Sequence, residues 1–394
     1  MREVLEMVMS PSQIPSLSML FMSFLKLGAT SFGGPAMIAY IRRMAVDQKN
    51  WIDDETFRAG VALCQAIPGA SAMQMAAYVG LRTRGVAGAA VTYIGFGLPA
   101  FLIIMLLSAL YEQTRDLSIA VSLFRGLQAI IVAIVAYAAL SFAKSYLKLW
   151  RDFVVAVLAA GMLILGISPF IVIIMAAFMG LIIYKDQMIQ QRPAASKKTP
   201  QTIVHLMLVS SVAAIGFVLL YLLQRDLFDL AASMFRIDLF AFGGGFASLP
   251  LMLHEVVFVR SWMDYQTFMS GIALGQITPG PIVITAAFVG YLVHGLIGGI
   301  VVTLGIFLPS FLILIGTVPY YDRLSSSLRF NRAVNGILCS FVGLLGSAAF
   351  HFASNMQVDI AHAIMAAMAL LALLLRIDIL WVILIGALIS VFVL

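Results

Sequence analysis

The sequence predicts an all-α polytopic membrane protein, built from two homologous inverted repeats of about six transmembrane segments with discontinuous helices. Three observations predict this class: an apolar composition, a duplicated set of motifs and the distribution of positive charge. Of the 394 residues, 62% are hydrophobic and 11% are charged, whereas a soluble domain carries about 25% charged residues. Residues 86–111 contain no charge, and an apolar run of 18 or more residues is long enough to cross a bilayer.

The polar residues indicate which classes of protein and site to expect. The net charge is +6, from 24 basic and 18 acidic residues, and we attribute it to cytoplasmic loops of a membrane protein, with no nucleic-acid partner. The first sixteen residues lack the apolar core and cleavage site of a signal peptide, so we expect them to stay in the mature chain. Cys64 and Cys339 are isolated in the sequence, which favours neither a disulfide framework nor a metal site. No cofactor is expected.

The second half of the chain repeats the first. Residues 76–103 align with residues 286–313 at a constant offset of 210, with 13 of 28 positions identical. Residues 51–69, which contain a Trp and a Gln-x-x-Pro-Gly motif, align with residues 262–280 at an offset of 211. Apolar helices resemble one another by composition, but shared Trp, Gln, Pro and spaced Gly residues indicate duplication.

The repeats define the predicted domains. Residues 1–184 form the first repeat and residues 228–394 form the second. A linker at 185–202 is expected in the cytoplasm, because its first sixteen residues carry four basic side chains and one acidic side chain. One unmatched helix at 203–227 is expected to cross the membrane between the repeats.

Each repeat is expected to begin with a helix broken at a double glycine and to continue with a segment broken at Pro-Gly. Four further helices follow, near residues 86–112, 118–143, 150–166 and 168–184 in the first repeat. With the unmatched helix this gives about 13 crossings, inverts the second repeat, and places the N-terminus in the cytoplasm and the C-terminus outside it. The count requires that the Pro-Gly segments cross the membrane and do not turn back. It also places Arg42 and Arg43 outside.

The helix breaks are the predicted substrate site. Irregular backbone inside a membrane is tolerated only against protein or a water-filled cavity, and a helix that restarts there presents free N–H groups and a positive dipole end to an anion. Close packing of small residues is the alternative interpretation, which we favour for Gly80, Gly85, Gly88 and Gly95. The candidates at the breaks, including two nearby hydroxyls, are Gly33, Gly34, Pro68, Gly69 and Ser71, with Gly243, Gly244, Pro279, Gly280 and Thr285 in the second repeat.

Two cations and two amides extend this predicted site. Lys26 lies about ten residues into the first helix, near the bilayer centre, where a charge needs a partner or a cavity. Arg236 holds the matching place in the second repeat, although it could instead extend to the interface or pair with Asp238. Gln65 and Gln276 precede the Pro-Gly breaks and offer neutral donors, or else bonds between helices. Such donors suit a divalent oxyanion better than a halide.

The motifs SFGGP (31–35), CQAIPG (64–69), FGGG (242–245) and GQITPGP (275–281) resemble the chromate transporter family in its long, two-domain form. The resemblance covers residues 16–385 and implies export of chromate across the bacterial inner membrane, with resistance to chromate and use of the proton-motive force. One departure is Ala70, which stands where the second repeat has Pro281.

The predicted mechanism is alternating access around a site at mid-membrane. His254 and Glu255 are candidate proton carriers, although a solvated helix end explains the pair equally simply. A homodimer is possible. The alternatives are an importer of sulfate or another oxyanion, an anion channel, and a membrane-embedded enzyme. Enzymatic chemistry is not expected, because the sequence contains none of the motifs H-E-x-x-H, G-x-S-x-G and G-x-x-x-x-G-K-[ST].

Overall fold

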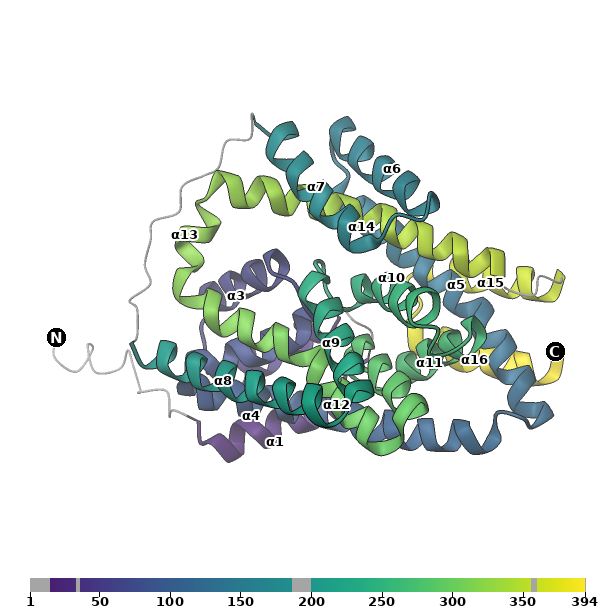
Figure 1. Ribbon diagram of the computed structural model, residues 1–394, viewed down its shortest axis with the longest axis horizontal. Coiled ribbons are helices and arrows are strands. Elements are labelled where there is room, and N and C mark those ends of the chain that lie inside the picture. Colours follow the sequence, from purple (N-terminus) through teal and green to yellow (C-terminus); the bar gives the residue numbers. More distant parts are fainter. Residues whose placement is uncertain (1–14, 33–35, 186–199, 356–359, 394) are drawn as a thin grey trace.

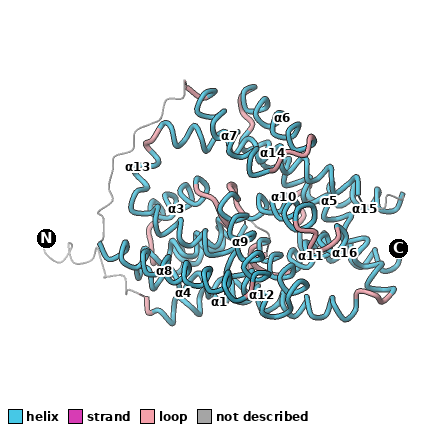
Figure 2. Tube along the Cα trace, in the orientation of Figure 1, coloured by secondary structure: helices cyan, strands magenta, loops and turns pink. Residues whose placement is uncertain are grey.

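The computed structural model describes residues 15–32, 36–185, 200–355 and 360–393. The regular structure of these residues is helical, and short loops join the helices (Figures 1 and 2). The first repeat contains α1 (Leu17–Thr30), α2 (Ala36–Arg42), the π-helix η1 (Arg43–Gln48), α3 (Asp54–Ala66), α4 (Ser71–Thr114), α5 (Ser118–Tyr146), α6 (Trp150–Ile164) and α7 (Pro169–Ile183).

The helix α8 (Pro200–Leu223) connects this repeat to the second and is almost wholly exposed. The second repeat has counterparts of these eight elements and four further short elements. It contains α9 (Arg225–Phe240), η2 (Gly245–Ala247), α10 (Ser248–Leu253), the π-helix η3 (His254–Val259), α11 (Tyr265–Ile277), η4 (Ile282–Ile284), α12 (Thr285–Thr317), η5 (Val318–Tyr320), α13 (Tyr321–Ser325), α14 (Leu328–Asn355), α15 (Ile360–Leu374) and α16 (Ile379–Val393).

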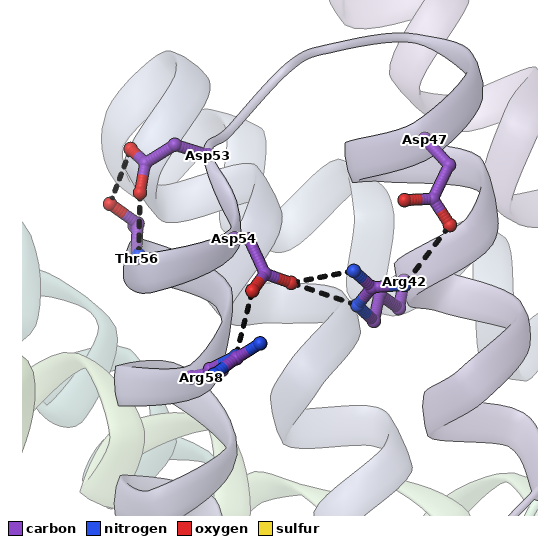
Figure 3. A network of polar contacts seen from close by, with 6 residues as sticks. All are labelled: Arg42, Asp47, Asp53, Asp54, Thr56 and Arg58. Carbon is purple, nitrogen blue, oxygen red and sulfur yellow. Dashed lines mark hydrogen bonds and ion pairs between the residues drawn. The ribbon is translucent and has the colours of Figure 1, made fainter.

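A polar loop at the end of η1 illustrates how the local sequence sets these elements. Asp53 caps α3 by accepting hydrogen bonds from the amide and hydroxyl of Thr56, at 2.7 and 2.8 Å (Figure 3). These bonds hold the pKa of the Asp53 carboxyl below its usual range. Asp264 caps α11 through Thr267 in the same way. In the first repeat Arg42 also binds Asp54 and Asp47, at 2.7 and 3.2 Å.

The chain turns back on itself at the glycine-rich break. In the second repeat, Ser233 of α9 donates a hydrogen bond of 3.1 Å to Glu255 of η3, and Asp229 pairs with Arg260 at 3.1 Å. The earlier residue of α9, Asp229, contacts Arg260 just after η3, and the later residue, Ser233, contacts Glu255 near the start of η3, so the two arms are antiparallel. In the first repeat the rings of Phe24 and Trp51 stack at 6.5 Å, which joins α1 to the end of η1 in the same sense.

The chain also turns back at Pro-Gly. A methyl group on Gly60 of α3 would lie 2.5 Å from the ring of Tyr78 in α4, and one on Gly271 of α11 would lie 2.3 Å from Phe288 in α12. In one continuous helix the first pair would be about 27 Å apart, so α3 and α11 pack antiparallel to the helices that follow them. The Pro-Gly segments therefore do not form the continuous helices that the count of 13 crossings assumes, and the number of crossings stays a prediction. Each forms a hairpin, and α3 and α11, with 13 residues each, are about 20 Å long.

A second reversal follows each Pro-Gly hairpin. Gly85, with φ +63°, and Gly295, with φ +60°, interrupt α4 and α12 in a conformation that favours glycine. A methyl group on Gly80 would lie 2.3 Å from the carbonyl oxygen of Gly88, although the two residues would be about 12 Å apart in a straight helix. Close packing, expected for this glycine set, is thus confirmed for Gly80 and Gly88, whereas Gly85 supplies the turn.

The last helices of each repeat pack on the other repeat. The pair α6 and α7 lies along α14, and the pair α15 and α16 lies along α5 (Figure 1). Small residues permit this close approach: Gly180 of α7 lies against Gly336 of α14, and Ser390 of α16 lies against Gly126 of α5. The two repeats therefore share one continuous hydrophobic core.

Among the described residues, five helices or helix runs are long and apolar enough to cross a membrane: 71–114, 120–146, 206–223, 282–320 and 328–355. Shorter apolar helices include α1, α7, α15 and α16. The all-helical, multi-span class predicted from the sequence is confirmed. The number of crossings depends on whether the hairpins at the helix breaks span the membrane or return to the side from which they enter.

Candidate functional site

The hairpin tips of the two repeats meet inside the protein. The amide of Gly69 donates to the carbonyl of Ala241, and the amide of Gly280 donates to the carbonyl of Ser31, both at 2.9 Å. These bonds are equivalent under exchange of the repeats, as in an interface with two-fold symmetry. We call the region formed by Ser31, residues 68–70, residues 238–245, residues 279–281 and Ser310 the tip junction.

The glycine-rich break of the second repeat lies between two helix starts. Gly243 and Gly244 adopt φ values of +90° and +95°, which glycine tolerates best. A methyl group on Gly244 would lie 3.2 Å from Oγ of Ser71, at the start of α4, and one on Gly245 would lie 2.9 Å from Ile282, at the start of η4. One loop thus contacts a helix N-terminus from each repeat. The predicted site residues Gly33 and Gly34 lie outside the described residues.

These helix starts are not capped by side chains. The N-cap residues Ala70 of α4 and Pro281 of η4 have no side-chain acceptor for the first N–H groups. The first N–H groups of a helix have no partner within it, and they carry the positive end of the helix dipole. Two such ends beside one loop give the tip junction the donors that an anion needs.

The two predicted hydroxyl donors are used locally. Ser71 donates to the carbonyl of Cys64 at 3.3 Å, and Thr285 donates to the carbonyl of Ile282 at 2.8 Å. Thr285 is also fully buried against Gly275 of α11. Ser71 remains next to the glycine loop and can still accept a hydrogen bond, whereas Thr285 serves helix packing.

The two predicted amides have different environments. Gln65 is exposed. The nitrogen Nε2 of Gln276 is buried with no hydrogen-bond partner among the described residues. Sequence reasoning missed Gln74, three residues into α4, which donates to the carbonyl of Pro68 at 2.6 Å and leaves its buried Oε1 unpartnered. The Pro-Gly tips therefore do carry neutral polar groups, but one comes from the helix after the break.

The two predicted cations have different environments. Lys26 is on an exposed face of α1 that also carries Met19 and Met22. Arg236 forms an ion pair with the buried carboxylate of Glu255 and lies over the ring of Phe170 at 4.6 Å. Contact of either cation with a substrate stays a prediction.

Glu255 is held by several donors at once. Its side chain is 1% exposed, and it accepts hydrogen bonds from Ser233 and Arg260, both at 3.1 Å, in addition to Arg236. Because two guanidinium groups contact this buried carboxylate, the group fits a structural ion pair better than the solvated helix end considered from the sequence. Its adjacent His254 lines a pocket of about 280 Å³ together with His351 and Ser347. A proton-carrying role for His254 and Glu255 stays a prediction.

The structure places Asp238 at the tip junction, which sequence reasoning did not. Asp238 is 0% exposed, and its Oδ2 accepts hydrogen bonds from the amide and hydroxyl of Ser310, at 2.8 and 2.5 Å. The pairing of Asp238 with Arg236 that the sequence left open does not form, because Arg236 binds Glu255 and Asp238 binds Ser310, as expected for positions two apart on a helix. The available signal was an acidic residue in the sequence FRIDLFAFGGG, within a largely apolar segment.

Among the described residues, no group of three or more His, Cys, Asp or Glu side chains could hold a metal ion. The fold and the tip junction define a duplicated, multi-span helical membrane protein whose broken helices meet in its interior, an arrangement typical of transporters. The family model "Chromate transporter" matches residues 18–181 and 228–391. The chain therefore belongs to the chromate transporter family.

Three relatives extend over most of the chain. An uncharacterized transporter of Methanocaldococcus jannaschii is 43% identical over 94% of this chain and 93% of its own. Chromate transport proteins of Pseudomonas aeruginosa and Cupriavidus metallidurans are each 31% identical, over 88% and 92% of this chain and 83% and 88% of theirs. No solved structure matches the chain.

Proposed function

We propose that this protein is a secondary transporter that exports chromate, a tetrahedral oxyanion, and that the tip junction binds the anion. The observation that carries this proposal is the meeting of the two uncapped helix starts, at Ser71 and Ile282, on the loop of Gly244 and Gly245. Two relatives with the printed name chromate transport protein support chromate as the substrate.

Backbone amides are the main donors in this proposal. Lys26 is exposed and Arg236 is paired with Glu255, so in this proposal the anion is held by helix ends, the loop amides and neutral side chains such as Gln276. Oriented amides in a dry site stabilise a bound anion without a counter-charge. Such a site is weaker than one with fixed cations, which suits a carrier that must release its cargo.

The hairpins support a revised topology. If both hairpins of a repeat enter and leave on one side, the crossings of the first repeat are residues 86–114 of α4, with α5, α6 and α7. Four crossings are even, as six were, so α8 still inverts the second repeat. Nine crossings replace thirteen.

This topology agrees better with the distribution of positive charge. Arg42, Arg43, Lys49 and Arg58 now fall on the cytoplasmic side, where positive residues are enriched. Arg82 and Arg84, Lys144 to Arg151, Arg323 to Arg332, and Arg376 stay on that side. Hairpins that enter from opposite sides then meet at mid-membrane, and rocking of one repeat against the other provides alternating access. Export of a dianion is favoured by about 2.3 kcal/mol per charge for each 100 mV, inside negative.

Flux in reconstituted vesicles tests the proposal. Purified protein is inserted in one orientation, and labelled chromate and sulfate are followed in both directions, with and without a pH gradient. Net movement of unchanged chromate from the cytoplasmic side supports export. Uptake of sulfate alone would identify an importer, currents far above carrier rates would identify a channel, and chromium recovered in reduced form would identify an enzyme.

A further inference from the structure

The tip junction is not symmetric, and its asymmetry centres on one buried carboxyl group. Asp238 of α9 is 0% exposed, its Oδ2 accepts two hydrogen bonds from Ser310, and its Oδ1 has no partner among the described residues. Ser310 in turn accepts a hydrogen bond of 3.2 Å from the amide of Ala70, the N-cap of α4. A polar chain thus leads from the start of α4 to Asp238.

The equivalent positions in the other half are unable to form this chain. At the offsets of the repeat, Gly28 corresponds to Asp238, Ala100 to Ser310 and Pro281 to Ala70. Pro281 has no N–H to donate, and a methyl group on Gly280 would meet the Cβ of Ala100 at 2.7 Å. The residues at all three equivalent positions thus prevent the polar chain in the other half. The chain is therefore specific to Asp238, Ser310 and Ala70 and is not a general property of the fold.

Among the residues whose side chains the structure describes, none that packs against Asp238 supplies a positive charge. From α12 the facing groups are the amide and hydroxyl of Ser310. From α4 the nearest titratable group is Tyr93, whose hydroxyl donates to the carbonyl of Phe307 at 2.8 Å. The ring contacts between α8 and α9 are those of Phe217 and Tyr221 with Phe228, and of Phe217 with Phe235.

The remaining nearby charges are used by other groups. α10 contains no ionisable side chain, and Arg236 and Arg260 bind Glu255. Among the described residues, Asp238 takes part in no salt bridge. An ionised carboxylate with one unpartnered oxygen at this depth is costly, and protonation removes the cost.

We propose that Asp238 is a proton-binding site at the tip junction, and that its protonation permits an oxyanion to bind at the adjacent start of α4. The second part rests on the proposed function. A dianion bound at the N-terminus of α4 would be linked to Asp238 through Ala70 and Ser310. Two negative charges so close together in a dry site repel one another. Proton binding and anion binding therefore favour each other, by the same factor in both directions.

Two variants isolate the site. Asp238→Asn keeps the shape of the side chain and is neutral at every pH. Asp229→Asn makes the same change on the same helix, at a carboxylate that is 43% exposed and paired with Arg260, and serves as the matched control. Ser310→Ala removes a hydrogen bond to the carboxylate and keeps the fold testable if Asp238→Asn does not fold.

The first measurement contains no oxyanion. Thermal unfolding of the purified protein in detergent is followed from about pH 5.5 to about pH 9, so that the range extends to both sides of neutral pH. The folded state holds a proton that the unfolded state releases, so the wild-type protein loses stability as the pH rises relative to Asp238→Asn, while Asp229→Asn follows the wild type. Ser310→Ala moves the transition to higher pH, because the ionised form has lost a donor. A difference between wild type and Asp238→Asn that is constant with pH, or an unmoved transition in Ser310→Ala, overturns the proton site.

The second measurement follows binding of chromate and of sulfate in detergent as a function of pH. Above the transition, wild-type affinity falls about tenfold per pH unit, as linkage to one proton requires. Asp238→Asn binds sulfate, which stays a dianion throughout the range, independently of pH. An unchanged pH dependence in Asp238→Asn overturns the coupling. If the unfolding result holds but the wild type binds neither anion, the proton site stands and the proposed oxyanion function fails.

Discussion

The amide of Gly69 donates a hydrogen bond of 2.9 Å to the carbonyl of Ala241, so the Pro-Gly tip of the first repeat is fastened to the glycine break of the second. The bond from Gly280 to Ser31 does the same in reverse. Each repeat thus satisfies backbone groups that the helix breaks of the other leave open, as burial away from water requires.

This arrangement makes Gly69 sensitive to substitution. Gly69→Ala places a methyl group 2.0 Å from Oγ of Ser310 at a φ of +118°, so we expect a loss of stability of at least about 2 kcal/mol and loss of flux. Gly161→Ala is the matched control, because Gly161 is helical and its added methyl group meets nothing within 4 Å. Unfolding in detergent and flux in vesicles measure both. A tolerated Gly69→Ala variant would contradict the packing of the tip.

Glu255 and Arg236 form an ion pair in which the carboxylate is buried and the guanidinium is partly exposed. Glu255→Gln leaves Arg236 and Arg260 without their buried counter-charge, and we expect it to cost about 3–5 kcal/mol. Arg236→Ala should cost clearly less, because its side chain is 46% exposed and Glu255 keeps Arg260. Chemical denaturation of the two variants gives the comparison. The reverse order of stability would show that Glu255 is not the centre of this network.

Lys26 tests the difference between sequence and structure. If Lys26 contacts the oxyanion, as the sequence predicts, Lys26→Ala should reduce the flux tenfold or more. Its exposed position on α1 leads us to expect flux within about twofold of the wild type. Initial rates of chromate flux at matched protein levels decide between these outcomes, with Lys26→Arg as a variant that keeps the charge.

The revised topology is tested with single cysteines. The native Cys64 and Cys339 are buried, so background labelling by a membrane-impermeant thiol reagent should be low. Lys49→Cys should react from the cytoplasmic side if the first hairpin turns back, and from the outside if it crosses. Lys148→Cys and Asp116→Cys lie inside and outside in both schemes and serve as orientation controls. Outside labelling of Lys49→Cys would restore the thirteen-crossing scheme.

The sequence alone determined the class, the duplication and the positions of the breaks. The Pro-Gly and glycine motifs predict helix breaks at their own positions, because proline lacks an N–H and glycine reaches positive φ values. The boundaries of α4 to α8 follow from apolar runs and turn residues in the same way. These signals act within a few residues, so one sequence is sufficient to read them.

The tertiary structure decided whether the chain continues or turns back at each break, and which side chains meet there. A break marks a change of direction without fixing the angle, which depends on contacts such as Gly60 with Tyr78, far apart in the sequence. For the same reason the sequence did not show that Arg236 binds Glu255, or that Asp238 and Ser310 come together across 72 positions. Helix faces and long-range packing set these outcomes, and a linear pattern carries neither.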